Sequence, residues 1–132
     1  MNAVFADTFF YLASLNPKDE AHQQAVSFAQ GYDGKIITTE FVFLEVADGL
    51  CKTHLRGRIH RFFDRLRMSS KHLIVPVRHD LFVKGLELYA SRPDKEWSLT
   101  DCTSFIVMQD HGITDALTGD HHFEQAGFRV LL

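Results

Sequence analysis

Short apolar runs alternate with longer segments of mixed polarity along the whole chain. The apolar runs are too short for helices and read as buried strands; they cover residues 2–6, 35–38, 72–77, 113–119 and 128–132. The segments between them read as helices, at about residues 8–15, 16–30, 39–52, 57–68, 80–89, 98–112 and 121–126. Short, mostly apolar strands that alternate with helices are typical of a parallel sheet covered on both faces. The pattern therefore predicts an α/β protein with a mainly parallel sheet of about five strands.

Two of the helix starts carry recognisable capping signals. Asn16-Pro17 places a good N-cap residue before a proline suited to the first helical turn, so we expect a helix from there to about Gln30. Ser98 and Asp101 have the spacing of a capping box, which predicts a helix that runs to about Gly112.

Composition is consistent with one globular unit. The 132 residues, 45% of them hydrophobic, suit a single domain over residues 1–132 with a sizeable core. No apolar run reaches the roughly 18 residues of a membrane span, and no secretory signal is visible. We therefore expect a cytoplasmic protein with no membrane partner, in which Cys51 and Cys102 are reduced core residues.

Charge is distributed unevenly along the chain. The net charge is −3, yet seven of the 14 lysine and arginine residues lie between Lys52 and Lys71, beside a single acid. Within this window Arg58, Arg61 and Arg65 have the spacing of one helix face. Such a face can bind phosphate groups, or it can simply be solvated.

Four acidic residues fall where a sheet of this kind would bring them to one edge. Asp7 ends the first strand, Asp120 follows the fourth, Glu45 lies in the helix after the second strand, and Asp101 lies in the first turn of another helix. Ligand sites in open parallel sheets form outside the carboxyl ends of the strands. Carboxylate oxygens suit Mg²⁺ or Mn²⁺, which can promote hydrolysis of a phosphodiester.

Each acid also has a purely structural explanation. Asp7 and Asp120 could cap the helices that follow them, Asp101 could serve only in its capping box, and Glu45 could be a solvated helix residue. It is the coincidence of four acids at one predicted edge that favours a metal site.

The chain resembles PIN-domain proteins, and most of all the VapC-type toxins of bacterial toxin–antitoxin pairs. The resemblance spans nearly the whole chain and rests on four stretches. They are Asp7-Thr8 after the first strand, TEFVFLEVADGL with Glu45, WSLTDCTSFIVMQDHGI with Asp101, and DALTGDHHFEQAGFRVL with Asp120. It implies a Rossmann-like α/β/α sandwich of three layers and an endoribonuclease that depends on Mg²⁺ or Mn²⁺.

The same resemblance implies roles for individual residues and partners. Asp7, Glu45, Asp101 and Asp120 would form the catalytic quartet, with Asp7, Asp101 and Asp120 touching the metal and Glu45 acting through water or as a base. The hydroxyls of Thr8 and Thr118 would orient carboxylates or contact RNA phosphates. The resemblance further implies a homodimer and a cognate antitoxin whose tail occupies the site. The helix with Arg58, Arg61 and Arg65 could then contact RNA, the antitoxin or a second subunit.

The remaining candidate residues are His121 and His122 beside Asp120. The sequence has no zinc-binding motif, and neighbouring side chains usually point apart, so we expect contact of His121 with RNA rather than a metal role for the pair. Trp97 and the phenylalanines read as core residues.

Two other functions compete with the nuclease. One is a catalytically inactive PIN-like module that binds RNA or protein through the same surface. The other is an aspartyl-phosphate phosphatase, which would need a second acid two residues after Asp7 and a late lysine. Phe9 occupies that position and no lysine follows Lys95, which disfavours this class.

Overall fold

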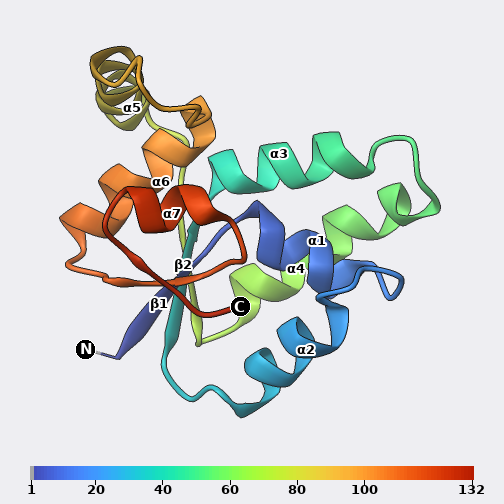
Figure 1. Ribbon diagram of the computed structural model, residues 1–132. Helices are drawn as coiled ribbons and strands as arrows, with labels where there is room; N and C mark the ends of the chain where they lie inside the picture. Colours follow the sequence, from blue (N-terminus) through green and yellow to red (C-terminus); the bar gives the residue numbers. More distant parts are fainter. Residues whose placement is uncertain (1) are drawn as a thin grey trace.

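The computed structural model describes residues 2–132 and contains one five-stranded sheet in which every neighbouring pair is parallel (Figure 1). The strand order is β3-β2-β1-β4-β5. The strands are β1 (Ala3–Ala6), β2 (Lys35–Thr39), β3 (His72–Val75), β4 (Asp115–Leu117) and β5 (Arg129–Val130). The predicted parallel sheet is confirmed.

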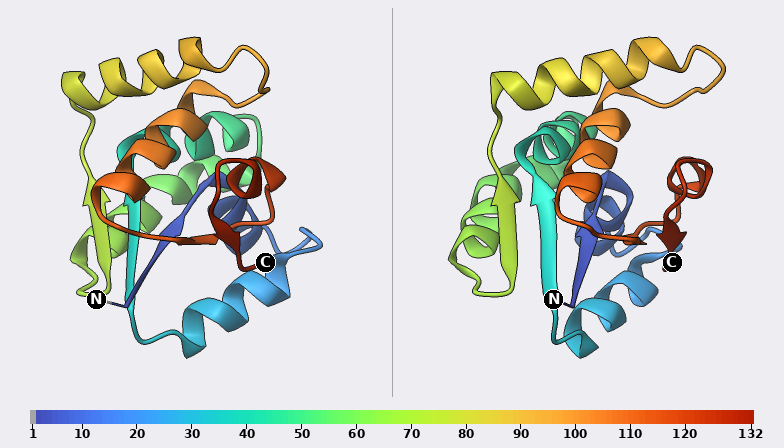
Figure 2. Two further views of the ribbon diagram at one scale, coloured as in Figure 1. Left: turned by 60° about the vertical axis from the view of Figure 1, so that its left-hand side comes forward. Right: turned by 90° about the vertical axis from the view of Figure 1, so that its left-hand side faces the viewer.

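Helices cover both faces of this sheet. The helical elements are α1 (Thr8–Leu15), α2 (His22–Gly31), α3 (Glu40–Leu50), the 3-10 helix η1 (His54–Arg58), α4 (Ile59–Met68), α5 (His79–Ser91), α6 (Leu99–Asp110) and α7 (His121–Gln125). Figure 1 shows α1, α2 and α4 on one side of the sheet and α6 and α7 on the other. In both views of Figure 2, α5 lies beyond the carboxyl ends of the strands. This is the expected three-layer α/β/α sandwich.

The strand order creates a switch point beside β1. The chain moves from β1 outward to β2 and β3, then returns to the other side of β1 with β4 and continues to β5. The connections on the two sides of β1 therefore lie on opposite faces, which opens a crevice at the carboxyl ends of β1 and β4. Asp7 directly follows β1, and Asp120 lies three residues after the end of β4. The topology itself brings these two acids to the crevice.

A row of aromatic side chains fixes the elements around this crevice. The ring of Phe105 in α6 packs edge-on against Trp97 and against Phe123 of α7, with both pairs of ring centroids 5.0 Å apart. Phe123 in turn lies 6.4 Å from Phe5 of β1. All four side chains are buried, as predicted for Trp97 and the phenylalanines, whereas Phe9 and Phe82 are exposed. This packing sets the positions of α6 and α7 relative to β1.

The structure corrects two expectations. The helix predicted to start at Asn16-Pro17 begins only at His22; the Asn16 side chain accepts from the Lys18 amide at 3.1 Å, and residues 17–21 form turns and a bend. Cys51 is exposed at the end of α3 and is no core residue, whereas Cys102 is buried as expected; both are free thiols. Across residues 2–132, every helix is too short or too polar to cross a lipid bilayer.

Candidate active site

Three helices point their N-termini into the crevice, and one of the predicted acids takes part in capping each of them. Asp7 is the N-cap of α1, Asp120 is the N-cap of α7, and Asp101 completes the capping box of α6 with Ser98. The structural explanation for each of these acids is thus correct. A structural role in capping does not exclude a functional role, since the capping hydrogen bonds fix the position of each carboxylate in the crevice.

Asp7 lies deepest in the crevice, with only 6% of its surface exposed. The Thr118 hydroxyl donates to Oδ2 at 2.9 Å, and the Phe10 amide approaches Oδ1 at 3.4 Å. Burial is the main reason that the pKa of Asp7 rises to about 8, and the charges of Asp120 and Asp101 raise it further against these hydrogen bonds. No basic side chain among the described residues contributes to this pKa. Asp7 is a buried acid that lacks a cationic partner.

Asp101 shares the electrostatic environment of the other acids. Burial raises its pKa most, the Ser98 amide opposes this shift, Asp120 and Glu45 raise the pKa further, and His122 lowers it. The four predicted carboxylates therefore act on one another: Asp7 is coupled to Asp101 and Asp120, and Asp101 is coupled to Glu45. The structure brings the acidic quartet together.

Two threonine hydroxyls bind these carboxylates. Thr8 donates to Oε1 of Glu45, which joins the start of α1 to α3. Thr118 donates to Asp7 and accepts from the Asp120 amide at 3.0 Å. Since Thr118 is fully buried, its hydroxyl orients the acids and cannot contact RNA, which removes one of the two roles expected for it.

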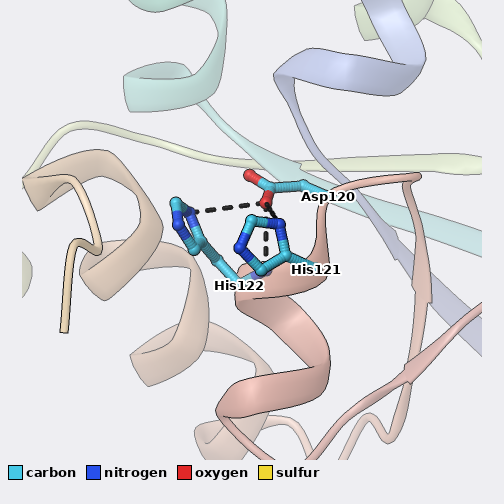
Figure 3. Close-up of side chains that lie close together, drawn as sticks. All are labelled: Asp120, His121 and His122. Carbon is cyan, nitrogen blue, oxygen red and sulfur yellow. Dashed lines mark hydrogen bonds and ion pairs between the residues drawn. The ribbon is translucent and has the colours of Figure 1, made fainter.

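The histidine pair differs from its prediction. Figure 3 shows both rings turned toward the Asp120 carboxylate, and their centroids lie only 4.5 Å apart. His122 Nδ1 lies 3.2 Å from Asp101 Oδ2 and 3.4 Å from Asp120 Oδ1, whereas His121 Nδ1 lies 3.8 Å from Asp120 and its ring is exposed. The expectation that the neighbouring rings point apart is wrong, and His122, for which the sequence predicted no role of its own, contacts two of the acids. The available signal was its place in the first turn of a helix capped by Asp120.

The predicted basic residues form a separate surface. Arg58 at the end of η1 and Arg61 and Arg65 on α4 line one groove together with Asp64, which confirms that they share a face. None of the three contributes to the pKa of Asp7 or Asp101. This arginine face can hold a phosphate backbone, but it is not part of the carboxylate cluster.

The residues in the crevice fit a divalent metal ion. Several carboxylate oxygens converge there, the most buried of them lacks a cation, and hydrogen bonds already fix their orientations. Hard oxygen donors of this kind suit Mg²⁺ and Mn²⁺. Acids gathered at the carboxyl ends of a Rossmann-like sheet make this crevice a candidate site for a divalent metal ion.

The chain belongs to the PIN domain family, whose model matches residues 4–129. It is similar to the 23S rRNA-specific endonuclease VapC20 of Mycobacterium tuberculosis, with 29% identity over 125 residues that cover 95% of each chain. The crystal structure of M. tuberculosis VapC20, described as a Sarcin-Ricin loop cleaving toxin, superimposes with a TM-score of 0.84 at 28% identity and covers 95% of both chains. A toxin–antitoxin complex from Klebsiella pneumoniae shares the fold, with a TM-score of 0.67 at 16% identity, over 98% of this chain and 96% of that one.

Proposed function

We propose that this protein is a VapC-type toxin, an endoribonuclease that cuts RNA with the help of a divalent metal ion. The observation that carries the proposal is the buried Asp7, which is coupled to Asp101 and Asp120 and has no cationic partner among the described residues. The similarity to VapC20 over almost the full length of both chains supports RNA as the substrate. A buried acid cluster of this kind is costly unless a cation binds it.

Each residue of the cluster has a role in this proposal. Asp7, Asp101 and Asp120 hold Mg²⁺ or Mn²⁺, and Glu45, fixed by the Thr8 hydroxyl, takes the proton of the attacking water or binds the ion through water. The ion supplies charge neutralisation on the phosphodiester and a lower pKa for water. The hydrogen bonds of Thr118 fix Asp7 relative to the start of α7, so the proposed ligands are oriented before a metal ion binds.

The arginine face and His121 contact the RNA backbone. Arg58 at the end of η1 and Arg61 and Arg65 on α4 are exposed, and His121 is exposed beside Asp120. Guanidinium groups pair well with phosphate, and each neutralised phosphate adds to the salt dependence of binding. Replacing Arg61 with Ala should therefore weaken RNA binding and reduce its salt dependence, while metal binding stays unchanged.

The protein acts with an antitoxin and as a homodimer. Structures that share its fold include complexes of toxins with antitoxins. A cognate antitoxin would block the crevice and keep the nuclease inactive until it is released. Light scattering of the isolated chain tests the dimer directly, because a monomer at all concentrations would contradict it.

The decisive experiment compares RNA cleavage by the wild type, Asp101→Asn and the control Asp110→Asn, with 23S rRNA and an unrelated structured RNA as substrates. An asparagine at position 101 can still accept the Ser98 amide, so α6 keeps its cap. Loss of one metal ligand should cost at least about a hundredfold in rate, since the metal supplies several kcal/mol. EDTA should abolish cleavage. RNA binding without metal-dependent cleavage by the wild type would instead indicate the inactive binding module.

A further inference from the structure

The imidazole of His122 lies against two of the proposed metal ligands. Its Nδ1 is 3.2 Å from Asp101 Oδ2 and 3.4 Å from Asp120 Oδ1, and its side chain is only 20% exposed. Figure 3 shows the ring turned back toward Asp120 from the first turn of α7. One nitrogen thus meets carboxylates that come from two different helices, α6 and α7.

These spacings are those of atoms that share one coordination sphere. Two donors at right angles, each about 2.1 Å from an octahedral ion, lie roughly 3.0 Å apart, and tetrahedral donors at the same distance lie roughly 3.4 Å apart. The contacts of His122 with Asp101 and Asp120 fall close to this spacing. Backbone amides hold both carboxylates independently: Ser98 N–H donates to Asp101 Oδ2 at 3.1 Å, and His122 N–H donates to Asp120 Oδ1 at 2.9 Å.

We propose that His122 is a nitrogen ligand of the divalent ion bound by Asp101 and Asp120, and that it makes the site prefer Mn²⁺ and other transition-metal ions over Mg²⁺. The inference rests on the proposed function only in placing a divalent ion at these acids. Imidazole nitrogen suits transition-metal ions, whereas Mg²⁺ prefers an all-oxygen sphere. A nitrogen donor therefore changes the selectivity of a site that the four acids alone would leave open to Mg²⁺.

The competing role for His122 is that of a positioning residue, whose ring N–H donates to Asp101 without touching the ion. Asparagine separates the two roles, because its amide nitrogen can donate a similar hydrogen bond but is a poor metal ligand. His121 provides the matched control, since it is next in sequence, carries the same ring and lies farther from Asp120, at 3.8 Å.

The experiment uses the full chain loaded with Mn²⁺ and records pulsed electron paramagnetic resonance, which detects ¹⁴N bound directly to the ion. We expect a nitrogen coupling in the wild type and in His121→Ala, and none in His122→Asn or His122→Ala. Calorimetry should show Mn²⁺ affinity falling by roughly tenfold or more in His122→Asn, the scale seen when even indirect partners of a metal are lost. Mg²⁺ affinity should change much less, so the preference for Mn²⁺ shrinks.

Several results would overturn the inference. They are absence of nitrogen coupling in the wild type, its persistence in His122→Asn, its loss in His121→Ala, or failure of Mn²⁺ to bind. Circular dichroism of each variant checks that the fold is retained, and His122→Asn serves if His122→Ala unfolds. RNA cleavage is measured separately, so the two proposals can fail independently. A cleaving enzyme without the coupling refutes only the role of His122, and a Mn²⁺-binding protein with the coupling but without cleavage refutes only the nuclease.

Discussion

Replacing Asp7 with asparagine should stabilise the metal-free protein at neutral pH, although it should destroy the proposed metal site. Burial raises the pKa of Asp7 to about 8 from an ordinary value of 3.8. A carboxyl whose pKa is raised by folding favours the folded state most below its unfolded pKa. The free energy of unfolding should therefore fall as the pH rises from about 4 to about 8. Asparagine does not titrate, so this decline in the free energy of unfolding should be absent from Asp7→Asn.

The size of the effect follows from this shift. A pH of 7 lies roughly three units above the pKa of the carboxyl in the unfolded chain, and each unit corresponds to about 1.4 kcal/mol. Keeping Asp7 protonated in the folded protein therefore costs roughly 4 kcal/mol. An asparagine in place of Asp7 would keep one acceptor oxygen for the two donors, Thr118 and Phe10, and losing one bond costs about 1–2 kcal/mol. The net gain is roughly 2 kcal/mol. For a chain of 132 residues this corresponds to a rise in Tm of roughly 5–10 °C.

Thermal unfolding in EDTA, followed by circular dichroism across this pH range, measures the effect. Asp7→Asn should raise Tm near neutrality and flatten its decline with pH, while the exposed Asp33→Asn should do neither. Added Mn²⁺ should stabilise the wild type and leave Asp7→Asn unchanged. If Asp7→Asn melts below the wild type at neutral pH and keeps the wild-type pH profile, folding does not raise the pKa of Asp7, and this acid does not need a cation.

Other substitutions test the parts that hold the site. Gly85→Ala in α5 should lower the free energy of unfolding by about 1–3 kcal/mol in a denaturant titration, because the added Cβ would lie 2.6 Å from Thr103 Cγ2 of α6. Gly31→Ala in α2 is the control: its Cβ meets no atom within 4 Å, so the free energy of unfolding should not change. Thr118→Val removes a donor that lowers the pKa of Asp7, so the decline of metal-free Tm should extend to higher pH and the Mn²⁺ affinity measured by calorimetry should fall.

Much of the fold and of the acidic quartet could be predicted because the signals are local. Most strands lie within short apolar runs, Asp7 directly follows β1, and Asp120 lies three residues after β4, so chain direction alone sets the edge of the sheet at which both acids lie. The capping box of Ser98 and Asp101 is likewise confined to four residues. Such features depend little on what the rest of the chain does.

The features that the sequence did not reveal depend on distant contacts or on competing local bonds. His122 approaches Asp101 only because the aromatic packing of Phe105 and Phe123 sets α7 beside α6, and no local pattern encodes that contact. The start of α2 was misplaced because Asn16 can cap a helix or hold a turn with equal chemistry, and here it holds a turn. Cys51 lies just past the end of α3, where a small shift in the helix boundary decides whether a side chain is covered.

The hydrogen bond from Thr118 to Asp7 joins residues 111 positions apart, and it has a consequence for how the protein is made. The ribosome delivers Asp7 111 residues before Thr118, and Asp120 follows two residues later, so the surroundings of Asp7 are completed only after this stretch has been made. During this interval the growing chain carries an incomplete acidic cluster. Fragments released before residue 118 lack both the bond and Asp120, so a prematurely terminated product has no complete acidic cluster.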